Sequence, residues 1–233
     1  MHFFYREDIS SSSIFLDKEE SRHCIKVLRL RQGDSIHLTD GKGNLAEGII
    51  ADDSLSGCGI NITERTSNKG ETKYRLSVAI APTKNHDRFE WFVEKATEIG
   101  VNEIIPLICS HSERRTVKVE RLKNIAVSAL KQSQKTFLPL IHDSVLFNDF
   151  VRRNNTEQKF ICTSDAPLSQ HLKNICKPNQ SYSVLIGPEG DFSPEEIKLA
   201  LENNFVEASL GTTRLRTETA GIVACCIVNF VNG

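Results

Sequence analysis

The chain has 233 residues and a formal net charge of −1 at pH 7; 39% of the residues are hydrophobic and 25% are charged. This composition is ordinary for a soluble globular protein, and the length suffices for one large domain or two small ones. The near-zero net charge excludes a global basic field, so any contact with nucleic acid must come from local basic patches.

No targeting segment or membrane span is expected. Residues 1–8 contain no apolar run of the signal-peptide type, and no stretch approaches the roughly eighteen apolar residues of a membrane span. The seven cysteines, an odd number, fit a reducing compartment. They form no C-x-x-C pair and no cluster with histidine at zinc spacing, so we expect no metal and a cytoplasmic location.

Residues 1–70 are predicted to form a β-rich domain. Ser35–Thr39 alternates apolar and polar residues, residues 40–44 have strong turn chemistry, and Leu45–Ala51 and Cys58–Thr63 supply further strands. Before them, Lys18–Leu28 has the pattern of a short helix.

Basic and titratable side chains are concentrated on this helix and just after it. Such a cluster can bind the phosphates of nucleic acid, and a solvated helix face is the alternative. The residues are Arg22, His23, Lys26, Arg29 and Arg31.

A polar segment separates this domain from the rest of the chain. Residues 66–73 contain one glycine and no apolar residue, which is typical of a linker, so we place the domains at 1–70 and 73–233. From Tyr74 onward strands and helices alternate, which predicts an α/β domain with a mainly parallel sheet covered on both faces. The expected strands are Leu76–Ala81, Glu103–Cys109, Lys159–Thr163, Tyr182–Ile186 and Phe205–Leu210.

Helices are expected between these strands. Asp87 with Glu90 and Ser193 with Glu196 have the pattern of capping boxes, and Gly100 is placed to end the first helix. The remaining helices are expected at Lys118–Ser133, at Leu168–Cys176, and from Thr217 or Thr219 to about Phe230. The last helix is apolar nearly all round, which predicts burial in the core or against a partner chain.

Two glycine-bearing turns follow the last two predicted strands. The first is Gly187-Pro188-Glu189-Gly190 and the second is Leu210-Gly211. Glycine allows a ligand to approach the backbone closely, and ligands of α/β sheets bind at the carboxyl ends of the strands. The two turns are therefore expected to share one pocket, although each could simply reverse the chain.

The turns and several other motifs resemble a known family. Residues 185–193 read LIGPEGDFS, residues 215–220 read LRTETA, residues 87–91 read DRFEW, and residues 94–101 read EKATEIGV. These motifs are similar to those of the RsmE family of ribosomal RNA uridine-N3 methyltransferases, in the SPOUT superfamily. The similarity extends from about His23 to Ala220. Two positions depart from the family pattern: Asp191 stands where glycine is usual, and Arg214 is displaced by one residue from the usual arginine.

The resemblance implies a fold and a set of functional residues. It implies a small N-terminal PUA-like β-barrel that contacts RNA, a C-terminal SPOUT α/β domain with a trefoil knot, and a homodimer. The implied substrate is N3 of one uridine in 16S rRNA, within the 30S subunit or free. The implied methyl donor is S-adenosylmethionine, with contacts from Thr163 and Ser164, Leu185, Gly187, Pro188, Glu189, Gly190, Ser209, Leu210, Gly211, Leu215 and Ala220.

Candidate catalytic residues follow the second turn. Because uridine N3 is a poor nucleophile while protonated, a guanidinium that stabilises the anion or a carboxylate that accepts the proton would help. Arg214, Arg216 and Glu218 have these chemistries. Arg216 could instead bind phosphate or form a structural ion pair, and Glu218 in a first helical turn is favoured by the helix dipole alone. Arg114 and Arg115 are expected to bind the RNA backbone.

Three functions remain open at this point. The first is the uridine-N3 methyltransferase, the second is another SPOUT enzyme such as a ribose 2′-O-methyltransferase, and the third is a non-catalytic RNA-binding protein that kept the fold. The N-terminal domain favours the first, and the intact glycine turns disfavour the third. The sequence lacks the G-x-G-x-x-G and G-x-x-x-x-G-K-[ST] motifs of nicotinamide and P-loop enzymes.

Overall fold

The computed structural model describes residues 2–233, which form two compact units. Of the described residues, the first unit comprises 2–71 together with 130–138, and the second comprises 72–129 and 139–233. The segment 130–138 belongs to the first unit although it lies far along the chain, and nothing in its sequence indicated that membership.

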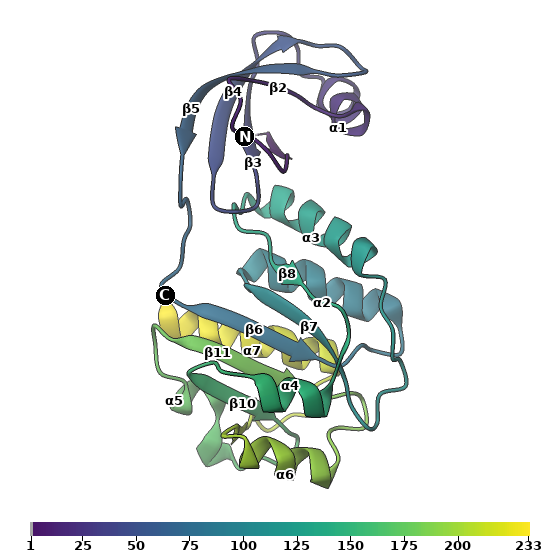
Figure 1. Cartoon of the computed structure of the whole chain (residues 1–233), viewed down its shortest axis with the longest axis vertical. Helices are drawn as coiled ribbons and strands as arrows, with labels where there is room; N and C mark the ends of the chain where they lie inside the picture. Colours follow the sequence, from purple (N-terminus) through teal and green to yellow (C-terminus); the bar gives the residue numbers. More distant parts are fainter. Residues whose placement is uncertain (1) are drawn as a thin grey trace. The chain divides into compact units, whose positions relative to one another are not determined.

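The first unit is built on a mixed five-stranded sheet with the order β1-β3-β4-β5-β2. Figure 1 labels β2 to β5 of this sheet. The predicted strands are present, whereas the short β1 and β2 were not predicted. β1 is parallel to β3, and the other neighbours are antiparallel. The strands are β1 (Phe3–Tyr5), β2 (Ser13–Phe15), β3 (Ser35–Thr39), β4 (Leu45–Asp52) and β5 (Gly59–Thr66).

The predicted helix of this unit forms in two parts. α1 (Lys18–Arg22) is capped by Asp17, whose carboxylate accepts from two backbone N–H groups, and a π-helix (His23–Val27) continues from it. Cys24 and Ile25 face the core with Phe4, Leu38 and Ile60, while the basic side chains stay exposed. The amphipathic pattern alone explains which side is buried.

The second unit contains a seven-stranded sheet in which all neighbours are parallel, as the alternation of strands and helices predicted. Its main order is β12-β10-β11-β6-β7-β8, and β9 pairs with β7. The strands are β6 (Arg75–Ile80), β7 (Glu103–Ile108), β8 (Leu140–Ile141), β9 (Val145–Leu146), β10 (Gln158–Cys162), β11 (Ser181–Ile186) and β12 (Val206–Ala208).

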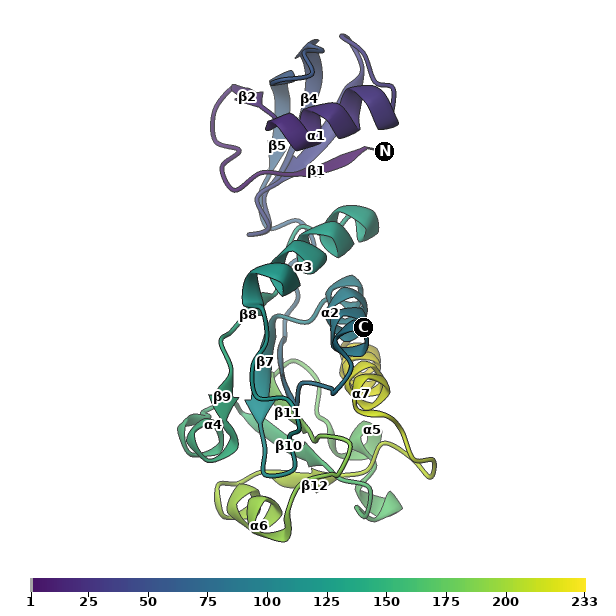
Figure 2. The same ribbon diagram turned by 90° about the vertical axis from the view of Figure 1, so that its right-hand side faces the viewer.

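Helices cover both faces of this sheet (Figure 2). α2 (His86–Ile99), α5 (Leu172–Ile175) and α7 (Thr217–Asn232) lie on one face, and α4 (Phe147–Arg153) and α6 (Pro194–Glu202) lie on the other. On the α4–α6 side, Leu107, Phe147, Leu185 and Phe192 belong to one buried apolar cluster. α3 (Val119–Ser133) starts in this unit. The trefoil knot implied by the family resemblance stays a prediction.

Three predicted helix features differ from the structure. α2 is capped by Asn85, whose Oδ1 accepts from the Asp87 N–H at 2.9 Å, and not by Asp87. The N-cap of α7 is Arg216, without a side-chain capping bond, and Thr217 is already helical. The expected helix Leu168–Cys176 is divided into a 3-10 turn (Leu168–Gln170) and α5. At α2 and α7 the predicted and observed starts differ by only one to three residues, because neighbouring residues are both compatible with a helix start.

Two other predicted features of the helices are confirmed. Ser193 and Glu196 form the capping box of α6 with Pro194 at its start, and Gly100 ends α2 in the left-handed conformation.

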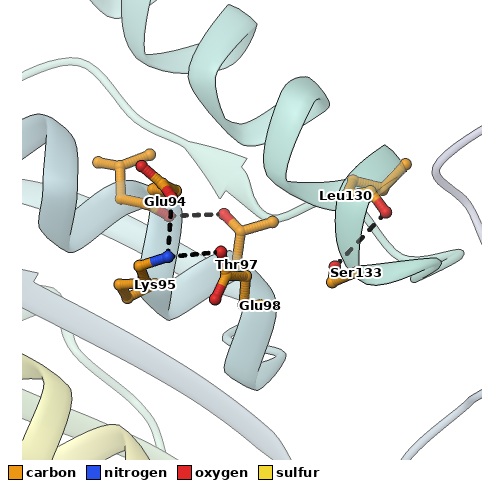
Figure 3. A network of polar contacts seen from close by, with 7 residues as sticks. Glu94, Lys95, Thr97, Glu98, Leu130 and Ser133 are labelled. Carbon is orange, nitrogen blue, oxygen red and sulfur yellow. Dashed lines mark hydrogen bonds and ion pairs between the residues drawn. The ribbon is translucent and has the colours of Figure 1, made fainter.

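Lys95 on α2 pairs with Glu94 and Glu98 (Figure 3), and each N–O distance is 2.8 Å. These charges form a partly exposed ion-pair cluster on the helix surface, which contributes little stability.

Candidate functional site

The two glycine-bearing turns line one pocket of about 730 Å³ in the second unit. It opens at the carboxyl ends of β10, β11 and β12, which is where ligands bind in open α/β sheets. Lining residues predicted from the sequence are Thr163, Ser164, Gly187, Pro188, Glu189, Gly190, Leu210, Gly211, Arg214, Leu215, Arg216 and Ala220. Because these strands are adjacent and parallel, turns that are about twenty residues apart in the sequence meet at the same sheet edge.

The first turn follows β11 and is held from three sides. Asp191 donates its N–H to the Pro188 carbonyl at 2.9 Å, which closes the turn. Glu189 Oε1 accepts from the Lys84 N–H at 3.0 Å, and His111 Nδ1 donates to the carbonyls of Gly190 and Asp191 at 3.2 and 3.0 Å. The turn, restrained by these bonds, forms one wall of the pocket.

The second turn follows β12 and depends on a backbone conformation that favours glycine. Gly211 has a φ of +127°, and a Cβ placed there would have no atom within 4 Å. Its N–H donates to Ser209 Oγ at 3.2 Å. A side chain would have ample room here, so it is the positive φ, and not a lack of space, that favours glycine.

Two predicted cofactor contacts and one predicted catalytic residue lie outside the pocket lining. Leu185 is fully buried in the apolar cluster on the α4–α6 side of the sheet. Ser209 is buried, and its hydroxyl supports the second turn. The Glu218 side chain is 9% exposed, and its Oε1 lies 3.8 Å from Nε of Arg88 on α2. Glu218 thus joins α7 to α2, at the first helical turn where the dipole also favours a carboxylate.

Both candidate arginines of the second turn line the pocket. Arg214 and Arg216 are exposed, and Arg216 is the residue directly before α7. Their guanidinium groups are therefore available to a bound substrate, whereas the arginines at 88 and 114 are engaged by protein groups.

Arg114 holds a neighbouring loop. Its Nε and Nη2 donate to the carbonyls of Thr83 and Lys84 at 3.2 and 2.8 Å, and Nη1 contacts the His86 ring. The Lys84 ammonium pairs with Glu113 at 2.9 Å, and the hydrogen bond to that carboxylate raises the pKa of Lys84. Arg115 is exposed. The sequence pattern did not distinguish these two adjacent arginines.

The basic residues of the first unit lie together around the π-helix. Arg22, His23, Lys26, Arg29 and Arg31 are all exposed, and the His23 ring meets Phe4 edge-on. Arg31 Nη1 donates to the carbonyls of Ile25 and Leu30, and Arg29 has a φ of +60°. The five side chains therefore expose their charges within ten consecutive residues of the chain.

The pocket contains an aspartate and a thiol that the sequence did not single out. Asp165 and Cys162 line it together with Asp191, the residue that departs from the family pattern. Burial raises the pKa of Cys162 to about 12, and the charge of Asp191 adds to the shift, so this thiol is neutral at physiological pH. The available signal for Asp165 was its position two residues after a predicted strand. Within residues 2–233, no group of three His, Cys, Asp or Glu side chains is arranged to hold a metal.

Family models match both parts of the chain. An RNA methyltransferase domain matches residues 70–229, and an RNA methyltransferase PUA domain matches residues 16–57. Together with the strand-end pocket, the two family matches define an RNA methyltransferase with a PUA domain.

None of the helices within residues 2–233 has the length and apolar character that crossing a membrane requires.

Relatives and solved structures cover nearly the whole chain. Ribosomal RNA small subunit methyltransferase E of Rickettsia conorii is 30% identical, over 95% of this chain and 91% of that protein. The crystal structure of a probable rRNA-methyltransferase from Porphyromonas gingivalis has a TM-score of 0.92 at 37% identity, covering 100% of this chain and 98% of that one. A ribosomal RNA small subunit methyltransferase E from Neisseria gonorrhoeae, bound to S-adenosyl methionine, has a TM-score of 0.90 at 25% identity, covering 100% and 98%.

The chain belongs to the ribosomal RNA small subunit methyltransferase E family. This assignment confirms the resemblance of the sequence motifs and the α/β fold with a PUA domain.

Proposed function

We propose that this protein transfers the methyl group of S-adenosylmethionine to N3 of one uridine in 16S rRNA. The observation that supports this most directly is the pocket formed by both glycine turns in a chain of this family. The solved relative from Neisseria gonorrhoeae is bound to the same donor.

The residues of the pocket fit such a donor. A volume of about 730 Å³ lies within the range of roughly 300–1,000 Å³ that small-molecule sites occupy. Gly187, Gly190 and Gly211 line the pocket, and the space beside Gly211 is open, while Leu210, Leu215 and Ala220 supply apolar surface for an adenosine ring. When bound, S-adenosylmethionine supplies an electrophilic methyl group on its sulfonium.

The protein must also make uridine N3 nucleophilic. The N3 proton has to pass to an acceptor, which in our proposal is solvent water at the open pocket, and the negative charge then spreads onto the two carbonyl oxygens of uracil. Arg214 and Arg216 at the pocket stabilise that anion in our proposal, because a guanidinium donates several hydrogen bonds and stays charged. Glu218 acts from its ion pair with Arg88, which holds the first turn of α7 and hence Arg216 in place.

RNA is bound in our proposal by the basic residues around the π-helix and by Arg115. Their charges are exposed and local, as a chain with a net charge of −1 requires. Arg114 contributes indirectly, because its guanidinium is occupied by the loop between β6 and α2.

The proposed homodimer uses α7. Phe230 is 80% exposed near the end of this helix, and Ile222, Val223 and Ile227 are only partly covered. An apolar helix face of this kind is typical of an interface. Sedimentation of the wild type should give twice the mass of 26.1 kDa.

Methylation of 30S particles and of naked 16S rRNA, both from a strain that lacks the enzyme, tests the proposed function. Mass spectrometry of the nucleosides should find 3-methyluridine, and comparison of the two substrates shows which one is used. A 2′-O-methylated nucleoside would indicate another SPOUT activity, and donor binding without any product would indicate a non-catalytic protein.

Two variants assign the roles of the charged residues. Arg216→Ala should lower kcat about 100-fold or more, which is the usual effect of removing a donor that stabilises developing negative charge. Arg115→Ala, an exposed arginine outside the pocket lining, is the matched control and should raise the KM for RNA while leaving kcat unchanged. Full activity of Arg216→Ala would refute the catalytic assignment.

A further inference from the structure

Asp191 occupies a left-handed backbone position, with a φ of +60°, at the end of the first glycine turn. An L-residue rarely adopts this conformation, and glycine adopts it without cost. The cost of placing an aspartate here must therefore be offset by its side chain.

The carboxylate of Asp191 makes three hydrogen bonds. Oδ1 accepts from the Phe192 N–H at 2.8 Å, and Oδ2 accepts from both the N–H and the hydroxyl of Ser164, at 3.0 and 2.7 Å. Ser164 follows β10, whereas Asp191 follows β11. One carboxylate thus ties together the loops after two adjacent strands.

This pair is part of the pocket wall. Asp191 and Ser164 line the pocket of the glycine turns, and they also line a second hollow of about 740 Å³ on the side of α6. The hydrogen-bonded pair of Asp191 and Ser164, called the tie below, therefore forms a ridge that is common to both hollows. If it opened, the wall of the first pocket on this side would be lost.

We infer that Asp191 is a positioning residue, and that its bond to Ser164 preorganises the pocket for the methyl donor. The inference rests on the proposed function, since it concerns the donor site of that reaction. A turn that is already fixed in the free protein loses less freedom when a ligand binds, so affinity rises without any additional contact. In the absence of the tie, each binding event has to order the two loops.

The Asp191→Gly variant tests this directly, because glycine suits the backbone and only the side chain is lost. Isothermal titration of the full chain with S-adenosylmethionine should show a Kd about threefold to tenfold higher than that of the wild type, the effect of one net hydrogen bond. Asp191→Asn, which keeps one acceptor and tolerates the left-handed conformation, should lie between the two. Ser164→Ala should have a smaller effect, because the backbone N–H of residue 164 remains.

Steady-state kinetics separate positioning from general loss of structure. The KM for the donor should rise by the same factor in Asp191→Gly, while kcat at saturating donor and the KM for 30S particles stay unchanged. Equal donor affinity in wild type and Asp191→Gly, or a change confined to the KM for RNA, would overturn the inference.

Amide hydrogen exchange in the free protein tests the tie without any ligand. The N–H groups of Ser164 and Phe192 should exchange about threefold to tenfold faster in Asp191→Gly, and amides of β6 should not change. Unchanged exchange at both positions would refute the claim that the Asp191 carboxylate holds the two loops. If the wild type bound no donor, the proposed function would fail, and this measurement would still decide whether Asp191 fixes the turn.

Discussion

Gly221 on α7 is the position at which the structure makes its sharpest prediction about packing. The residue is buried where α7 packs on α2 and β6. A Cβ added there would lie 2.6 Å from Cε2 of Phe92 and 2.9 Å from Cδ1 of Ile80. Carbon atoms in contact are normally about 3.5–4.0 Å apart, so the Phe92 ring must move by about 1 Å within a closed core.

Two effects of the Gly221→Ala substitution oppose each other. Overpacking of a core costs about 1–3 kcal/mol, while alanine is favoured over glycine inside a helix by about 1 kcal/mol. Taking about 2 kcal/mol for the first effect, we expect a net loss of about 1 kcal/mol in the free energy of unfolding. For a unit of about 150 residues this corresponds to a Tm lower by about 2–4 °C.

The chain contains one tryptophan, Trp91, next to Phe92 on α2. Its fluorescence therefore reports unfolding of the second unit. Urea titrations of wild type and Gly221→Ala should show a lower midpoint at an unchanged m-value. The double variant Gly221→Ala with Phe92→Leu is the matched control: the smaller side chain makes room for the new methyl, so the two changes should be less destabilising together than their sum.

A more stable Gly221→Ala variant would refute this reasoning. Such a result would mean that helix propensity outweighs the contact with Phe92 and that α7 is free to move away from α2. Strict additivity of the two substitutions would equally show that the methyl group and the ring do not compete for the same space.

Three further predictions concern charge and titration. Glu218→Gln should lower kcat less than tenfold, far less than Arg216→Ala, because its carboxylate contacts Arg88 and not the pocket; kinetics of both variants side by side check this. Cys162 should resist alkylation in the folded protein at pH 8, which thiol titration measures. Because burial raises its pKa to about 12, above the ordinary value of 9.0, its contribution to stability is complete below pH 9 and is lost as the pH rises toward 12. Urea midpoints at pH 8 and 10.5 measure this loss. Lys26→Ala should weaken RNA binding and reduce the slope of log K against log salt by about 0.7–1, whereas unchanged slopes would place the RNA elsewhere.

Much of this protein could be predicted from short sequence patterns. The alternation of apolar strands with helical patterns indicated a parallel sheet, and the capping box at Ser193 and the glycine at Gly100 marked helix ends at the correct residues. Both glycine turns were correctly expected to follow strands and to share one pocket. These features follow from local backbone preferences and from the period of apolar residues, which are properties of a few neighbouring residues.

The order of the strands and the pairing of distant side chains were decided only in three dimensions. The position of β10 between β11 and β12 brings Ser164 to Asp191, and the packing of α7 on α2 turns Glu218 toward Arg88 and away from the pocket. Arg114 and Arg115 are adjacent and chemically identical, yet one is bound to loop carbonyls and the other is exposed. Local patterns cannot determine such outcomes, because each depends on which segments, far apart in the chain, the folded sheet places side by side.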